Sequence, residues 1–168
     1  MRIIGIDPGL RNTGWGVIET KGDKILEVAN GICDTKTSDN LSLRLRAIYE
    51  KLSMVLTKYK PDQAAVESTF VNKDASNTLK LGQARGVCML VPALAGLRVE
   101  EYAPNAIKKA VVGVGHASKE QIKYMVKLHF PKIQLRSIDS TDALAVAICH
   151  SNHLRNSVKM HRKLLNSA

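Results

Sequence analysis

Four carboxylates in this 168-residue chain occupy positions from which they could bind metal ions. Asp7 ends the apolar run of residues 3–6, and the proline-glycine pair that follows forces a turn, so this acid is placed at the tip of a buried strand. Glu67 ends a second short apolar run. Asp139 and Asp142 lie three residues apart in the first turn of a predicted helix, so both side chains project from one face.

Each of these acids also has a purely structural explanation when it is taken singly. Aspartate is a favoured turn residue, which would account for Asp7. An acid at a helix N-terminus followed by another three residues later resembles ordinary capping, which would account for Asp139 and Asp142. The combination is harder to explain in this way. Several carboxylates at one sheet edge raise each other's pKa unless cations lie among them.

Carboxylate ligands select hard cations, so the sequence predicts a site for Mg²⁺, with Mn²⁺ as a substitute. Two such ions about 4 Å apart serve in-line cleavage of a phosphodiester, since one activates water and the other stabilises the leaving oxygen. The formal charge of +10, from 25 Lys and Arg against 15 Asp and Glu, favours a polyanionic partner such as nucleic acid. An anionic membrane surface is the competing partner, and no strongly amphipathic basic helix supports it. A basic protein with an acidic metal site is typical of a nuclease.

The elements that must position these acids form a predicted α/β fold. Strands are expected at residues 3–7, 14–18, 23–34, 63–67 and 99–102. The first three form an antiparallel meander, and the fourth follows a helix and therefore lies parallel to the first. Helices are expected from an N-cap at Ser38 or Asp39 to about Tyr59, then at about 75–94, 104–109, 118–130 and 139–154, with a capping box formed by Ser118 and Gln121.

Length and composition indicate one globular domain, residues 1–155, followed by a loosely held basic tail, residues 156–168. The sequence has no apolar window of membrane-spanning length and no leader pattern, so a cytoplasmic protein is expected. Cys33, Cys88 and Cys149 are far apart among apolar neighbours, which predicts three buried thiols rather than disulfides or a zinc site.

Several motifs of the sequence resemble those of the RuvC family of Holliday-junction resolvases. The similarity runs in order from residue 1 to about residue 153, and it is carried by Gly5-Ile6-Asp7-Pro8-Gly9 with Thr13-Gly14, Val66-Glu67 with Phe70, Leu79-Lys80-Leu81-Gly82-Gln83-Ala84-Arg85-Gly86, Val111-Val112-Gly113, and Asp139-Ser140-Thr141-Asp142-Ala143-Leu144-Ala145. The block around Gly82 and Gly86, together with the four spaced acids, makes the resemblance specific.

This resemblance implies a ribonuclease H-like fold with a five-stranded mixed sheet and helices on both faces. It also implies a homodimer that makes two metal-dependent, symmetric nicks in a four-way DNA junction, and partnership with the RuvA and RuvB branch-migration proteins. By position, the metal-binding and catalytic acids of the family fall on Asp7, Glu67, Asp139 and Asp142, its functional lysines on Lys108 and Lys119, and its junction-probing aromatic on Phe70. Some members have histidine where this chain has Asp139.

Other interpretations stay open at this point. An RNA-processing nuclease of the same fold, an actin-like or sugar-kinase ATPase, and a purely architectural junction binder each fit part of the pattern. Lysines are usually solvated, and an aromatic such as Phe70 can equally pack on the core. Gly82 and Gly86 are expected to pack on the sheet or across a dimer interface, and His150 and His153 to complement the dipole at the end of a helix.

Overall fold

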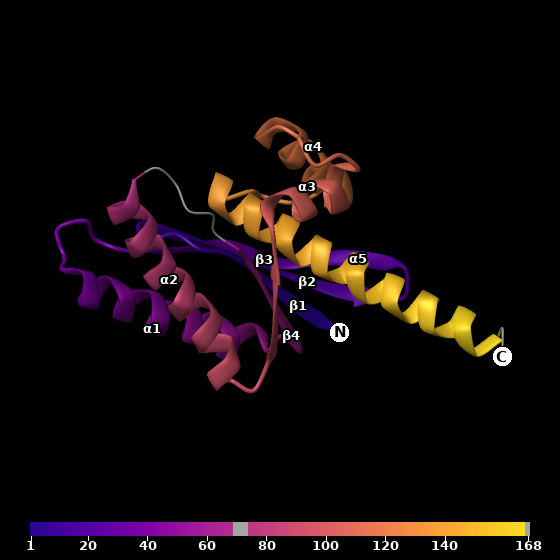
Figure 1. Cartoon of the computed structure of the whole chain (residues 1–168), viewed down its shortest axis with the longest axis horizontal. Coiled ribbons are helices and arrows are strands. Elements are labelled where there is room, and N and C mark those ends of the chain that lie inside the picture. Colours follow the sequence, from indigo (N-terminus) through magenta and orange to yellow (C-terminus); the bar gives the residue numbers. More distant parts are fainter. Residues whose placement is uncertain (69–73, 167–168) are drawn as a thin grey trace.

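The computed structural model describes residues 1–68 and 74–166, with the side chains of the last helix described as far as residue 157 and at Met160 (Figure 1). Its centre is a five-stranded sheet in the order β3-β2-β1-β4-β5. The strands are β1 (Arg2–Asp7), β2 (Asn12–Lys21), β3 (Lys24–Asp34), β4 (Gln63–Glu67) and β5 (Arg98–Tyr102). β1, β2 and β3 pair antiparallel, whereas β4 pairs parallel to β1 and β5 parallel to β4, so the predicted mixed sheet is confirmed.

Helices cover both faces of this sheet (Figure 1). α1 (Leu41–Tyr59) and α2 (Ala75–Leu94) lie together on one face, and α5 (Ile138–Asn166) crosses the other. α3 (Pro104–Val112) and α4 (Lys119–His129) pack on the outer side of α5. The chain therefore forms three layers, with one apolar cluster on each side of the sheet.

Successive side chains of a strand point to opposite faces of the sheet, which explains the two apolar clusters. Ile4 and Ile6 of β1 face α1 and α2, whereas Ile3 faces α5. All three side chains are fully buried. Burying such side chains stabilises the fold by about 1.5–3 kcal/mol each, so the middle of β1 is a rigid platform for the acid at its end.

Glycines allow the start of α5 to lie directly on the sheet. A Cβ atom at Gly5 would lie 2.1 Å from the carbonyl oxygen of Ala143, and one at Gly14 would lie 2.1 Å from that of Asp139. Any larger residue at either position would push the helix away. The first turn of α5 is thereby held beside the ends of β1 and β2.

Three helix boundaries differ from those predicted. α1 is capped by Asn40, whose side chain accepts a hydrogen bond from the Leu43 amide, rather than by Ser38 or Asp39. α3 continues to Val112 and ends at Gly113, whose φ of 93° suits glycine. α5 continues to Asn166 rather than ending near Leu154, because residues 155–166 contain no glycine or proline to stop a helix.

Other local predictions are confirmed. The capping box of Ser118 and Gln121 is present with both hydrogen bonds, and α2 has the bounds expected for it. The three cysteines are free and buried. No helix in the described ranges 1–68 and 74–166 is long and apolar enough to span a membrane.

Candidate active site

The strand pairing brings two of the predicted acids to one edge of the sheet. Ile6 of β1 is paired with Val66 of β4, and Asp7 and Glu67 are the residues that follow them. Because β1 and β4 run parallel, both carboxylates leave the sheet at the same carboxyl-terminal edge. On the other side of β1, Thr13 donates a hydrogen bond of 2.8 Å to the carbonyl oxygen of Gly9 and so closes the turn after Asp7.

A hollow of about 280 Å³ lies over this edge of the sheet. Asp142 reaches it from near the start of α5, Lys108 from α3 and Lys119 from α4. The residues that line it are Asp7, Glu67, Pro104, Ile107, Lys108, Lys119, Ile122, Asp142 and Ala145. Three predicted acids and both predicted lysines therefore meet in one place, although five separate segments supply them.

Asp139 lies beside this group but does not line the hollow. Its Cβ atom is 3.1 Å from the position that a Cβ atom at Gly14 would take, so it sits against the start of β2. Its charge still reaches the hollow, because it contributes to the raised pKa of Asp7 and of Asp142. Asp139 is therefore an outlying member of the acidic group.

Burial and mutual repulsion raise the pKa of each acid in the hollow. The pKa of Asp7 lies well above its usual range because the carboxyl is buried and because Glu67, Asp142 and Asp139 carry like charges nearby. Burial, followed by the charge of Asp142, raises the pKa of Glu67 to about 7. Burial raises the pKa of Asp142 as well, although Lys119 acts in the opposite direction. Such clusters of perturbed carboxyls are typical of functional sites.

The donor set suits divalent cations with hard oxygen ligands. Carboxylates dominate the polar side chains of the hollow, and cations among them would reverse the repulsion that raises their pKa. Within the part of the chain that the structure describes, no three such side chains already stand close enough to hold one ion.

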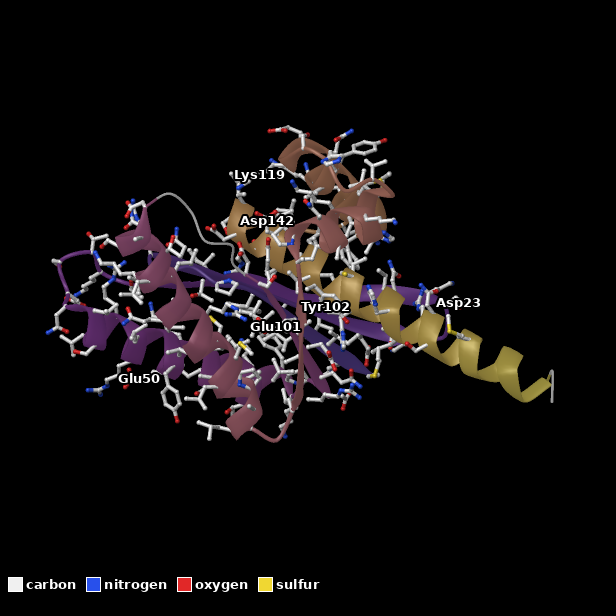
Figure 2. The ribbon with its side chains drawn as sticks, in the orientation of Figure 1. Asp23, Glu50, Glu101, Tyr102, Lys119 and Asp142 are labelled. Carbon is white, nitrogen blue, oxygen red and sulfur yellow. The ribbon has the colours of Figure 1, made fainter. Side chains whose placement is uncertain are left out.

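Lys119 and Lys108 are placed as the sequence predicts. Lys119 opens α4 directly after its N-cap, Ser118, and its Nζ lies 3.9 Å from the Asp142 Oδ2 (Figure 2). Its side chain remains 71% exposed, so it is available to a ligand. Lys108 faces the same hollow, where its charge lowers the pKa of Glu67 and Asp142.

Phe70 lies outside the described residues, so its predicted role stays a prediction. The expectation that Gly82 and Gly86 pack on the sheet is wrong. Both are exposed on α2, and no atom lies within 4 Å of a Cβ atom at either position among the residues that the structure describes.

The setting of His150 differs from the one expected from the sequence. It lies in the middle of α5 rather than at its end, and it is 1% exposed. Its Nδ1 is 2.8 Å from the hydroxyl of Tyr102, and its Nε2 is 2.7 Å from the Oε1 of Gln63. The sequence does contain an indication of this burial, because His150 shares one helical face with the apolar residues Ala143 and Ala147.

Comparisons with known proteins agree with this geometry. The family model of crossover junction endodeoxyribonuclease RuvC matches residues 3–150. A RuvC from Cereibacter sphaeroides is 58% identical over 168 residues, which are 100% of this chain and 99% of that protein. One from Rhizobium johnstonii is 56% identical over 164 residues, covering 98% of this chain and 96% of the relative.

Solved structures show the same likeness. A structure described as T. thermophilus RuvC in complex with Holliday junction substrate superposes with a TM-score of 0.87 at 31% identity, covering 94% of this chain and 96% of the other. A yeast mitochondrial Holliday junction resolvase, with a TM-score of 0.65 at 13% identity over 95% of this chain and 85% of its own, shares the fold. These matches confirm the expected ribonuclease H-like architecture, and the chain belongs to the RuvC family of crossover junction endodeoxyribonucleases.

Proposed function

We propose that this protein is a divalent-metal-dependent endonuclease that resolves four-way DNA junctions, nicking two strands symmetrically and leaving ends that a ligase can seal. The observation that carries the proposal is the hollow in which Asp7, Glu67 and Asp142 meet Lys108 and Lys119. Membership of the RuvC family gives the substrate class. Since that substrate is DNA, we expect the protein to act in the bacterial cytoplasm.

Asp7, Glu67 and Asp142, with Asp139 beside them, are the residues that would hold the cations. We propose two Mg²⁺ ions for each site, with Mn²⁺ as a substitute, because carboxylate oxygens prefer hard ions. Bound there, the ions supply a nucleophile from water and charge stabilisation at the leaving oxygen. Occupation of the site would also release the protons that burial and repulsion hold on these carboxyls.

The two lysines bind the phosphate of the substrate rather than the metal ions. The exposed ammonium of Lys119 can bind a phosphate oxygen while it remains near Asp142. Lys108, which lines the same hollow, adds a second positive charge that offsets the charge developing in the transition state. The apolar side chains of Ile107 and Ile122 line the same hollow and limit the entry of bulk water.

A comparison of substrates tests the proposal. Purified protein is incubated with a mobile four-way junction, a linear duplex of the same sequence and an RNA–DNA hybrid, each in Mg²⁺, in Mn²⁺ and in EDTA. We expect paired nicks in the junction, little cleavage of the other two substrates and none in EDTA. Faster cleavage of the hybrid would identify an RNA-processing enzyme, whereas junction binding without nicking in any metal would identify an architectural protein.

We also propose a homodimer, because two equivalent strands call for two equivalent sites. The outer face of α2 supports this proposal, since it exposes a row of apolar side chains. Gly82 and Gly86 lie in the same row and would allow the backbone of a second protomer to approach closely. Leu79, Leu90 and Leu94 on this helix are 65%, 52% and 67% exposed. Sedimentation at micromolar concentration tests the dimer, and a monomer that still makes paired nicks would refute it.

Two further assignments stay proposals. Family membership supports partnership with RuvA and RuvB, which co-sedimentation on junction DNA would test. We retain a catalytic domain ending near residue 155, followed by a basic segment, residues 156–168, that is dispensable for the chemistry. A chain truncated at Asn156 that folds but no longer nicks junctions would contradict this division.

A further inference from the structure

A second depression lies along the outer edge of β3, away from the hollow that holds the acids. Two hollows of about 690 Å³ and 550 Å³ share the residues Trp15, Lys58 and Tyr59 and therefore form one continuous depression. We call this depression the edge groove. It passes from the outer side of α1 to the segment of residues 132–136, which precedes α5.

The edge groove is basic. Lys58, Lys132 and Arg136 line it and are exposed, and in the described part of the chain none of the three forms an ion pair. At the far end Lys51 is neutralised by Asp34, since its Nζ lies 2.6 Å from an aspartate oxygen. The groove therefore presents three cations against one carboxylate, Glu27, whose Oε1 accepts a hydrogen bond from the side-chain amide of Asn30. Its excess of positive charge suits a polyanion.

The floor of the edge groove is aromatic. The indole ring of Trp15 lies over Gly31, where a Cβ atom would come within 2.6 Å of a ring carbon. The absence of a side chain at Gly31 is thus what lets the ring extend toward the edge strand. The ring of Tyr59 follows at 5.5 Å between centroids, and Lys58 Nζ lies 5.2 Å from the Tyr59 ring. Aromatic rings flanked by cations are typical of surfaces that bind nucleic acid.

One wall of the edge groove is formed by the segment that precedes α5. Asn30 of β3 holds this wall in place, because its amide donates to the carbonyl oxygen of Gln134 and its Oδ1 accepts from the Arg136 amide. Arg136 precedes Asp139 by three residues, so their Cα atoms are at most about 11 Å apart. This wall of the groove therefore leads directly into the helix that carries Asp139 and Asp142.

We propose that the edge groove binds the sugar-phosphate backbone of one DNA arm of the junction, with Lys58, Lys132 and Arg136 on successive phosphates and Trp15 beside the sugar edges. This inference rests on the proposed function, because it takes the junction as the ligand. The excess of positive charge and the aromatic floor favour DNA over an acidic protein segment. The contact is to backbone and carries no sequence preference of its own.

The test compares two variants with equal loss of charge. The first is Lys58→Gln, Lys132→Gln, Arg136→Gln. The control is Lys21→Gln, Lys24→Gln, Arg98→Gln, which removes three cations near the opposite end of the sheet, where Glu19 pairs with Arg2 and Arg98 pairs with Gln63. Junction binding is measured in EDTA by fluorescence anisotropy of labelled DNA over a series of salt concentrations.

We expect the groove variant to lose about 10- to 100-fold in affinity at 0.1 M salt, with a salt slope smaller by about 2 to 3, because each phosphate contact contributes about 0.9. The affinity and the salt slope of the control variant should change little, apart from the general effect of its lower net charge. Trp15 is the only tryptophan of the chain and supplies a second measurement. Junction DNA should protect its fluorescence from acrylamide quenching in wild type and control, and less so in the groove variant.

Several outcomes would overturn the inference. Equal affinity and slope for the two triple variants, with no protection of Trp15, would show that DNA does not enter the groove. Protection of Trp15 by an acidic peptide but not by the junction would assign the groove to a protein. Wild-type protein that binds the junction tightly but nicks nothing in Mg²⁺ would instead refute the proposed function.

Discussion

The acids of the hollow should make the metal-free protein less stable than it would be without them, and Glu67→Gln should reveal this cost. The pKa of Glu67 rises from 4.5 to about 7 because the carboxyl is buried and Asp142 is near. At 1.36 kcal/mol per pKa unit, ionising this group at pH 8 costs the folded state roughly 3 kcal/mol. Glutamine has nearly the same shape and carries no charge, so the variant should avoid that cost.

The dependence on pH has a definite sign. Because the folded protein binds the proton of Glu67 more tightly than the unfolded chain does, the stabilisation by the neutral carboxyl is fully present below pH 4.5 and is lost as the pH rises through about 7. The difference between Glu67→Gln and wild type should therefore be near zero at pH 4.5 and largest at pH 8. For a chain of 168 residues, about 3 kcal/mol corresponds to roughly 6–12 °C in melting temperature.

Thermal melts in EDTA at pH 4.5, 6 and 8 measure this difference. Glu50→Gln is a matched control, because Glu50 is an exposed residue of α1 that pairs with Arg46, and its loss should change stability by less than about 1 kcal/mol. Adding Mg²⁺ at pH 8 should raise the melting temperature of wild type more than that of Glu67→Gln. A variant no more stable than the control at pH 8 in EDTA would refute the electrostatic reasoning.

Four other changes test separate parts of the molecule. Asp7→Asn or Asp142→Asn should abolish nicking while junction affinity, measured by gel shift, stays equal or rises, and near-normal cleavage would remove that residue from the metal site. Lys119→Ala should slow single-turnover cleavage at least tenfold while lowering the salt slope of binding by only about 1, and equal losses of rate and affinity would make it a simple backbone clamp. Phe70→Ala should fold and bind but cut poorly, with rescue by a junction that has unpaired bases at its centre; a lowered melting temperature with normal nicking would place the ring in the core. Because burial lowers the pKa of His150, its stabilising contribution is present above pH 6.5 and fades below it, so the gap in melting temperature between wild type and His150→Gln should narrow from pH 7.5 to 5.5.

Much of the fold could be predicted because its determinants are local. Apolar periodicity separates strands from helices, so α2 was predicted with the bounds that the structure has, although Pro92 lies inside it. Placing Asp7 and Glu67 together also needed only a topological rule, since parallel strands present their carboxyl ends at one edge. The sequence by itself therefore determined the strand order near β1 and the acids that lie there.

Other features depend on distances between segments that the sequence does not encode locally. The approach of α5 to Gly5 and Gly14 brings Asp142 to the hollow and leaves Asp139 beside it, which a helical spacing of three residues could not distinguish. The burial of His150 follows from the continuation of its helix across the sheet.

The edge groove shows most clearly what tertiary structure alone decided. Its cations come from α1 and from the segment before α5, and its indole ring comes from β2. In the sequence these residues are isolated charges and one tryptophan, each of which is ordinary on a protein surface. They become the proposed ligand surface only because packing of the helices on both faces of the sheet brings them together at the edge of β3.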